Sequence, residues 1–189
     1  MIFTALNDKV KNKVLTLYSK HLTRKLKKKQ IVDPSPQSLH IGLVYTHDAA
    51  KPYKTEAISQ IVQKLQAEQQ YVQILCYVPH PKPTTIHIPF NIITKQEINL
   101  LGRSSNTAIN TFLHSPFTQL YHLDHESDPI LDYIIAKCTA RHKIGHYLAG
   151  REYLFDIMFK DLSPQEEQEE ASFGSIIDKM FHYIKMLKV

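Results

Sequence analysis

The chain lacks the motifs that mark the common nucleotide-binding and hydrolytic sites. No G-x-G-x-x-G follows the apolar run at 39–45, and no G-x-x-x-x-G-K-[ST], H-E-x-x-H, C-x-x-C or G-x-S-x-G occurs in the sequence. Only five glycines are present, too few for the usual glycine-rich phosphate cradle. These absences argue against a dinucleotide-binding or P-loop activity, but they do not exclude a fold of that type.

Cysteines and long apolar runs are also scarce. The two cysteines, Cys76 and Cys138, both lie among apolar residues, which favours buried thiols in a reducing compartment over a disulfide. No run approaches the ~18 apolar residues of a membrane span, and residues 1–14 lack the pattern of a secretory signal. We therefore expect a cytoplasmic protein without a transmembrane segment. The oligomeric state cannot be read from the sequence.

The positive charge is concentrated near the N-terminus. Residues 1–30 hold nine Lys and Arg residues and one acid, Asp8, whereas the whole chain has a net charge of only +5. Three- and four-residue spacing predicts an amphipathic helix over 6–29. Its expected apolar face consists of Val10, Val14, Leu17, Tyr18, Leu22 and Leu26.

The chain divides into three expected parts. Residues 1–30 form the basic amphipathic helix, and residues 31–38, with Pro34 and Pro36, form a linker. Residues 39–189 form a single α/β domain in which short apolar runs alternate with amphipathic stretches. The expected strands are 39–45, 71–78, 90–93, 117–123, 141–147 and 153–159, and the expected helices are 55–69, 104–115, 128–140 and a last helix after a capping box at 163–166. A short helical turn is also expected at 95–102.

This alternation predicts the fold class. Strands that are apolar along their length are typical of a parallel sheet covered on both faces. We predict a three-layer α/β/α sandwich, Rossmann-like or flavodoxin-like, with a mostly parallel sheet of five or six strands. The order of the strands cannot be read from the sequence.

Polar residues follow most of the predicted strands. Ligands of open parallel sheets bind outside the carboxyl ends of the strands, so these residues are candidates for a shared site. They are His47, Asp48, His80, Asp124 and His125, together with His146 at the end of the strand predicted at 141–147. Imidazole and carboxylate groups suit metal binding or acid–base chemistry near neutral pH, but polar strand-to-helix loops and helix capping explain the same residues. Asp128 before Pro129 is best explained as a helix N-cap.

A second candidate lies at 102–107. Arg103 and Ser104 precede a predicted helix, whose free N–H groups favour an anion, and ordinary capping by serine explains them too. No catalytic residue, cofactor or metal-ligand set is predicted. The ligand considered for the strand ends is a small phosphorylated molecule or a metal ion.

The basic helix has three interpretations. It could bind nucleic-acid phosphates, lie on an anionic membrane, or pack its apolar face on the domain. The cations considered for the first two are Lys20, Arg24, Lys25, Lys27, Lys28 and Lys29.

Two resemblances add to this reading. The stretch FNIITKQEINLLGRSS, with FTQLYHLDHESDPILDYIIAKCTARHKIGHY after it, resembles an uncharacterised bacterial family known only as a domain of unknown function. That resemblance implies a Rossmann-like fold over most of the chain and assigns no activity. Residues 129–145 are more weakly similar to the acceptor-side domain of heptosyltransferase-like glycosyltransferases, which implies a degenerate half-domain without the donor-nucleotide half.

Overall fold

The computed structural model describes residues 2–26, 39–79, 88–99, 103–126, 128–160 and 169–187. Its elements, in chain order, are α1 (Ile2–Leu26), β1 (His40–Thr46), α2 (Tyr53–Ala67), β2 (Tyr71–Val78), β3 (Asn91–Thr94), α3 (Thr107–His114), β4 (Pro116–His122), α4 (Pro129–Lys137), β5 (Thr139–His146), β6 (Ile157–Phe159) and α5 (Glu169–Met186). The predicted linker at 31–38 and the capping box at 163–166 lie outside the described residues.

Most predicted elements are confirmed within a few residues, with two exceptions. Of the strand predicted at 153–159, only Ile157–Phe159 is a strand, and the residues before it form turns. The helical turn predicted at 95–102 is a non-helical turn where it is described. Asp128 caps α4 as predicted, because its carboxylate accepts the Ile130 N–H at 2.7 Å and Pro129 occupies the first turn.

The six described strands form one sheet in which every pairing is parallel. Their order is β3-β2-β1-β4-β5-β6. This is the order of the doubly wound α/β fold, in which the chain first moves toward one edge of the sheet and then returns to the middle to build the other half. The predicted α/β sandwich is confirmed, and the reversal falls between β1 and β4.

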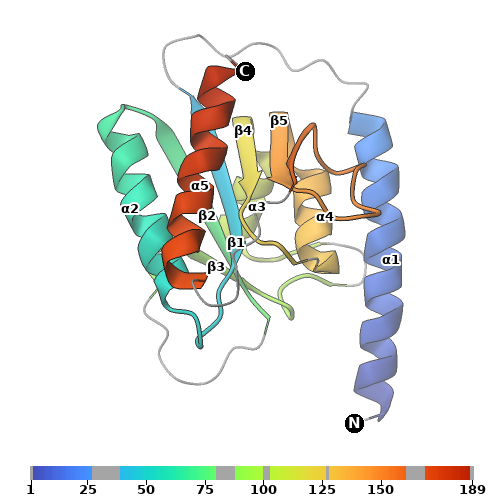
Figure 1. Ribbon diagram of the computed structural model, residues 1–189. Helices are drawn as coiled ribbons and strands as arrows, with labels where there is room; N and C mark the ends of the chain where they lie inside the picture. The colour runs from blue at the N-terminus through green and yellow to red at the C-terminus, as the bar shows by residue number, and fades with distance from the viewer. Residues whose placement is uncertain are drawn as a thin grey trace.

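Helices cover both faces of the sheet. Figure 1 shows α2 and α5 together on one side of the sheet and α4 between the sheet and α1. One apolar cluster lies between the sheet and the helices α2 and α5, and Ile58 and Met180 are fully buried in it. The other cluster lies under α3 and α4 and includes Leu15 of α1. None of the helices in the described residues has the length and apolar character that crossing a membrane requires.

The N-terminal helix packs along α4 through a face that the sequence did not predict. Leu15 is 1% exposed, and Ser19 and Thr23 are buried beside it. The Ser19 and Thr23 hydroxyls donate to the backbone carbonyls four residues earlier, at 2.7 Å and 3.0 Å. A hydroxyl satisfied by its own helix can be buried at little cost. Two small polar residues therefore bring α1 close to α4.

The predicted apolar face of α1 is wrong for most of its members. Val10, Val14, Leu17 and Tyr18 are between 41% and 62% exposed, although the Tyr18 ring stacks on Tyr133 at 6.0 Å. Of that face, Leu22 does pack against the core cluster. The helix thus presents an apolar stripe to solvent, which we call the α1 stripe and define as Val10, Val14 and Leu17.

Two leucines that lie two residues apart, and so on nearly opposite sides of α1, test this orientation. Leu15→Ala should cost about 2–3 kcal/mol of unfolding free energy, because it leaves a cavity against α4. Leu17→Ala should change stability by less than about 0.5 kcal/mol, because its side chain is exposed. Urea denaturation of the full chain measures both. Equal effects, or a larger effect at Leu17, would contradict the described packing of α1.

Candidate functional site

The site candidate lies where the chain reverses direction in the sheet. β1 and β4 are hydrogen-bonded neighbours, but β1 continues into α2 on one face and β4 continues into α4 on the other. In open α/β sheets this switch point, at the carboxyl ends of the strands, is where ligands bind. The residues that follow β1 and β4 therefore need the closest inspection.

Asp124 connects the two halves of the sheet at this point. Its side chain, in a residue only 3% exposed, accepts the backbone N–H of Thr46 at 2.5 Å and pairs with Lys54 Nζ at 3.0 Å. Thr46 ends β1, and Lys54 lies in the first turn of α2. Asp124 thereby ties the end of β4 to the end of β1 and the start of its crossover helix.

Three histidines surround this carboxylate. The rings of His125 and His146 lie 3.8 Å apart between centroids. His122 is 1% exposed, and its Nε2 lies 4.0 Å from Asp124 Oδ2, too far for a hydrogen bond. Burial lowers the pKa of His122 well below its usual range, and nearby positive charge, first of all Arg151, lowers it further. Burial also lowers the pKa of His146 to about 3, so both imidazoles are neutral at physiological pH.

A buried arginine closes the cluster on the α4 side. The Arg151 guanidinium donates to the Asp132 carboxylate of α4, and its Nη1 donates to the Glu126 carbonyl at 3.4 Å. The guanidinium lies 5.4 Å from the Phe155 ring centroid, and His122 stacks on the same ring at 6.0 Å. We define the rim cluster by its six central members, which are Lys54, His122, Asp124, His125, His146 and Arg151.

Several polar atoms in the rim cluster are buried without a partner. Within the described part of the chain, no hydrogen bond is made by either ring nitrogen of His122, by His146 Nε2 or by Arg151 Nε. Buried polar atoms are nearly always hydrogen-bonded, so a concentration of unpaired ones points to a place where a ligand or ordered water belongs. The donors and acceptors here come from β4, β5 and the loop after β5.

His47 and Asp48, predicted site residues after β1, lie at the same end of the sheet. His47 Nδ1 is 3.3 Å from the Thr55 hydroxyl of α2, and burial lowers the pKa of this imidazole. The exposed Asp48 carboxylate accepts the Ala50 N–H at 2.9 Å, which is a local turn contact. His47 therefore borders the rim cluster, whereas Asp48 stabilises the loop.

The remaining predicted site residues fall elsewhere. His80 lies outside the described residues. Burial lowers the pKa of Lys137, and the positive charge of Arg103 lowers it further, so Arg103 lies near Lys137. Lys137 ends α4 at the amino-terminal edge of the sheet. Ser104 accepts the Asn106 N–H at 3.1 Å, and Asn106, not serine, caps α3. The structure thus does not bring Arg103 or Ser104 to the rim cluster.

Sequence reasoning missed three contributors to the rim cluster. They are His122, which lies inside the predicted strand at 117–123 and not after it, and Lys54 and Arg151, which do not follow a predicted strand directly. Lys54 lies two residues after Pro52 and directly before the amphipathic helix predicted at 55–69. A cation at a helix N-terminus is unfavourable for the helix dipole, and that mismatch was an available signal. The position of Arg151 directly after Gly150 offered a weaker signal, because glycine is typical of turns. In the structure Gly150 does lie in a turn, with a φ of +84°.

The rim cluster is not arranged as a metal centre. In the described ranges, no group of three or more His, Cys, Asp or Glu side chains is placed to hold a metal ion. Lys54 and Arg151 also place positive charge next to the imidazoles, which disfavours a cation there. The donors instead suit a polar ligand that accepts hydrogen bonds.

The fold and the rim cluster define a doubly wound parallel α/β protein with a polar site at its switch point. The chain belongs to a family of unknown function, DUF6913, whose model matches residues 11–187. No curated protein and no solved structure matches the chain. The expected membership of an uncharacterised family is confirmed, and the similarity to heptosyltransferase-like enzymes and the bacterial origin stay predictions.

Proposed function

We propose that this protein binds a small phosphorylated ligand at the carboxyl ends of β1, β4 and β5. The observation that carries the proposal is the group of buried, unpaired polar atoms of His122, His146 and Arg151 at the switch point. These atoms lack partners in the described residues, and the fold places them where ligands of open sheets bind.

The charges of the rim cluster favour an anionic group. Lys54 keeps 19% of its side chain exposed beside the buried Asp124, so a ligand can reach its ammonium group from solvent. Lys54 lies in the first turn of α2, where the helix dipole adds positive potential. A phosphate supplies several acceptor oxygens, which match the lysine ammonium group and the ring N–H groups of neutral histidines.

Two lysines of α2 provide a matched test. At a hundredfold excess over its Kd, a ligand stabilises the folded state by about 2.7 kcal/mol, which raises the Tm of a domain of this size by about 5–10 °C. We expect inorganic phosphate or a hexose phosphate to produce this rise, and Lys54→Met to remove most of it. Lys64→Met should retain the rise, because Lys64 pairs with Asp178 on an exposed surface away from the rim.

The same thermal-shift experiment also tests an unphosphorylated sugar and a metal ion as ligands. The unphosphorylated hexose should give no shift, and zinc chloride should give none. If phosphate and hexose phosphate leave Tm unchanged at millimolar concentration, or if Lys54→Met and Lys64→Met behave alike, the proposal is wrong. Stabilisation by zinc alone would replace it with a metal site.

A second candidate function uses the exposed side of α1. Five exposed cations alternate with the residues of the α1 stripe along the helix. They are Lys9, Lys13, Lys20, Arg24 and Lys25. Lys11 is not among them, because its ammonium group donates to the Lys95 carbonyl at 2.8 Å. The other cations considered from the sequence, Lys27, Lys28 and Lys29, lie outside the described residues. Cations beside exposed apolar residues are typical of helices that lie on anionic lipid, whereas nucleic acid would use the cations alone.

We therefore propose that α1 binds an anionic surface, and two variants test this. Vesicles containing phosphatidylserine should cosediment with the wild-type chain, and vesicles of phosphatidylcholine alone should not. Leu17→Ser should weaken lipid binding, because it removes apolar contact, while Leu15 keeps the fold. Salt-sensitive RNA binding that Lys20→Glu reduces and Leu17→Ser leaves intact would support the nucleic-acid alternative instead.

The two buried thiols support a proposal for the cellular compartment. Cys76 and Cys138 are both free and buried, on different elements of the core. Burial raises the pKa of the Cys76 thiol to about 11 and that of Cys138 to about 12, so neither is a reactive thiolate at neutral pH. Two inert buried thiols fit a reducing compartment, and we propose the cytoplasm.

A further inference from the structure

A groove lies between α2 and α5, near the amino-terminal ends of β1 and β4. Both helices begin at the rim end of the sheet, and Figure 1 shows them diverging away from that end. Near the rim they are close, because a Cβ on Gly174 would lie 3.7 Å from the Ala57 Cβ and the rings of Tyr53 and Phe173 meet edge to face. Farther along, they leave a groove of about 450 Å³. This volume falls within the range of small-molecule sites.

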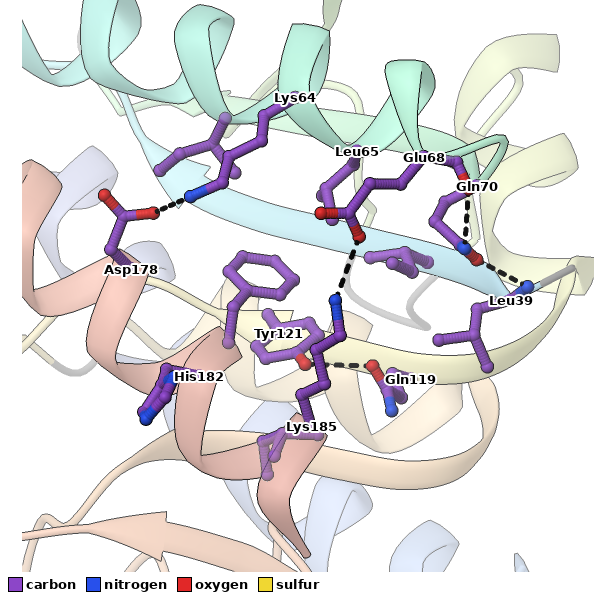
Figure 2. A pocket seen from close by; sticks show the side chains of 14 residues that line it. Leu39, Lys64, Leu65, Glu68, Gln70, Gln119, Tyr121, Asp178, His182 and Lys185 are labelled. Carbon is purple, nitrogen blue, oxygen red and sulfur yellow. Dashed lines mark hydrogen bonds and ion pairs between the residues drawn. The ribbon is translucent and has the colours of Figure 1, made fainter. Parts of the chain in front are cut away.

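The floor and walls of the groove are mostly apolar. Figure 2 labels Tyr121 and Leu65 among the lining side chains. Ile41 and Tyr121 come from the two central strands, Leu65 comes from α2, and Phe181 and Ile184 come from α5. Except for Phe181, these side chains are buried in the protein and are part of, or pack on, the α2–α5 core cluster. A ligand in the groove would contact the core directly, and burial of apolar ligand surface would supply most of its affinity.

One polar pair interrupts the apolar floor. The Tyr121 hydroxyl donates to Gln119 Oε1 at 2.9 Å, and both residues line the groove although they are 0% and 3% exposed. A buried amide and phenol on a core strand give a ligand a fixed hydrogen-bonding point and so set its orientation. Their position at the floor indicates a ligand with one hydrogen-bonding group at its buried end.

The mouth of the groove carries balanced charge. Figure 2 shows two ion pairs that span from α2 to α5, Lys64–Asp178 at 2.9 Å and Glu68–Lys185 at 3.5 Å. All four side chains are 46–78% exposed, so each pair contributes little stability and can separate to admit a ligand. Two cations and two anions give the mouth no net attraction for a charged molecule.

We propose that this groove binds an uncharged, largely apolar small molecule with a single hydrogen-bonding group. The groove shares no lining residue with the rim cluster, although Tyr121 at its floor precedes His122 along β4. Its volume is too small for a folded partner, and its balanced mouth does not select an anion such as the phosphorylated ligand of the rim.

Nile red, an uncharged and mostly apolar dye, probes the groove in the full chain. We expect saturable binding with one dye per chain and a blue-shifted emission. Leu65→Trp fills the wall of the groove and should weaken dye binding roughly tenfold or more. Leu17→Ser on α1 should leave binding unchanged, because α1 packs on α4, on the other face of the sheet.

An NMR titration of the wild-type chain gives a result that does not depend on the folding of a variant. The backbone amide signals of Leu39, Leu65 and Tyr121 should shift on addition of the dye, and those of Val14 and Leu17 should not. Shifts confined to α1, loss of binding in Leu17→Ser with retention in Leu65→Trp, or no saturable binding would each overturn the proposal.

Discussion

Acidification from pH 6.5 to pH 4.5 is expected to remove at least about 2.5 kcal/mol of unfolding free energy, the share of His146 alone. His122 and His146 are buried, and burial lowers the pKa of each in the folded state, that of His146 to about 3. In the unfolded chain both return to about 6.5 and bind protons below that pH. His146 therefore costs about 1.4 kcal/mol per pH unit over this range, and His122 adds to the loss in the same direction. A loss of this size is a large fraction of the stability of a typical domain.

The sign of this effect is set by which state binds the proton. The stabilising contribution of a neutral buried histidine is complete above pH 6.5 and is lost as the pH falls toward the folded pKa. Burial also lowers the pKa of three other histidines, His40, His47 and His142. These are less buried and add to the loss in the same direction.

Urea denaturation at a series of pH values measures the acid effect. His122→Leu should reduce the slope of unfolding free energy against pH, because it removes one group whose pKa burial lowers in the folded state. His21→Gln is the control, since His21 is exposed on α1. A stability that is flat between pH 6.5 and pH 4.5, or a slope that His122→Leu leaves intact, would contradict the burial of this imidazole.

Asp132→Ala is expected to destabilise the protein by about 3–5 kcal/mol. Asp132 and Arg151 are 4% and 5% exposed and form an ion pair. Removal of the carboxylate leaves a buried guanidinium without its counter-ion, which costs far more than the pair contributes when intact. The loss should appear as a lower urea midpoint with an unchanged m-value.

An exposed pair on the other face supplies the comparison. Asp178→Ala breaks the pair with Lys64, whose side chain is 64% exposed, and should cost less than about 1 kcal/mol. The double variant Asp132→Ala with Arg151→Met should recover much of the loss, because no unpaired charge remains. If Asp132→Ala costs no more than Asp178→Ala, the guanidinium is not held in a buried site.

Local sequence patterns were sufficient to predict the elements of the sheet. β2 was predicted residue for residue, because its apolar and β-branched run has no competing helical period. The Asp128–Pro129 cap of α4 was also predicted, because it depends only on neighbouring residues. Ile157–Phe159 was predicted too long, because Tyr153, Leu154 and Phe155 are apolar residues that the fold buries in turns.

The orientation of α1 could not be predicted from apolar periodicity. The rule assigns the larger apolar side chains to the core, and it therefore selected Val10, Val14 and Leu17. The structure buries Ser19 and Thr23 instead, because α4 approaches closely where the side chains are small and their hydroxyls are satisfied locally. Which face of a helix meets its neighbour depends on the neighbour as well as on the helix.

The rim cluster was predicted only in part for a related reason. Asp124 and His125 follow a strand and His146 ends one, and all three were identified by that position alone. Lys54 and Arg151 come from a helix and a turn, and Lys54 is 70 residues from the carboxylate it pairs with. Such contacts require the strand order β1-β4-β5, which no local pattern contains.

Imidazole NMR tests most directly whether the rim cluster is a ligand site. Long-range ¹H–¹⁵N spectra of the full chain would be recorded at pH 7.5 with and without a saturating hexose phosphate. A phosphorylated ligand in the rim cluster should shift the ring nitrogens of His122 and His146 and leave those of the exposed His21 in place. Unchanged His122 and His146 signals, or equal shifts at His21, would contradict binding at the switch point.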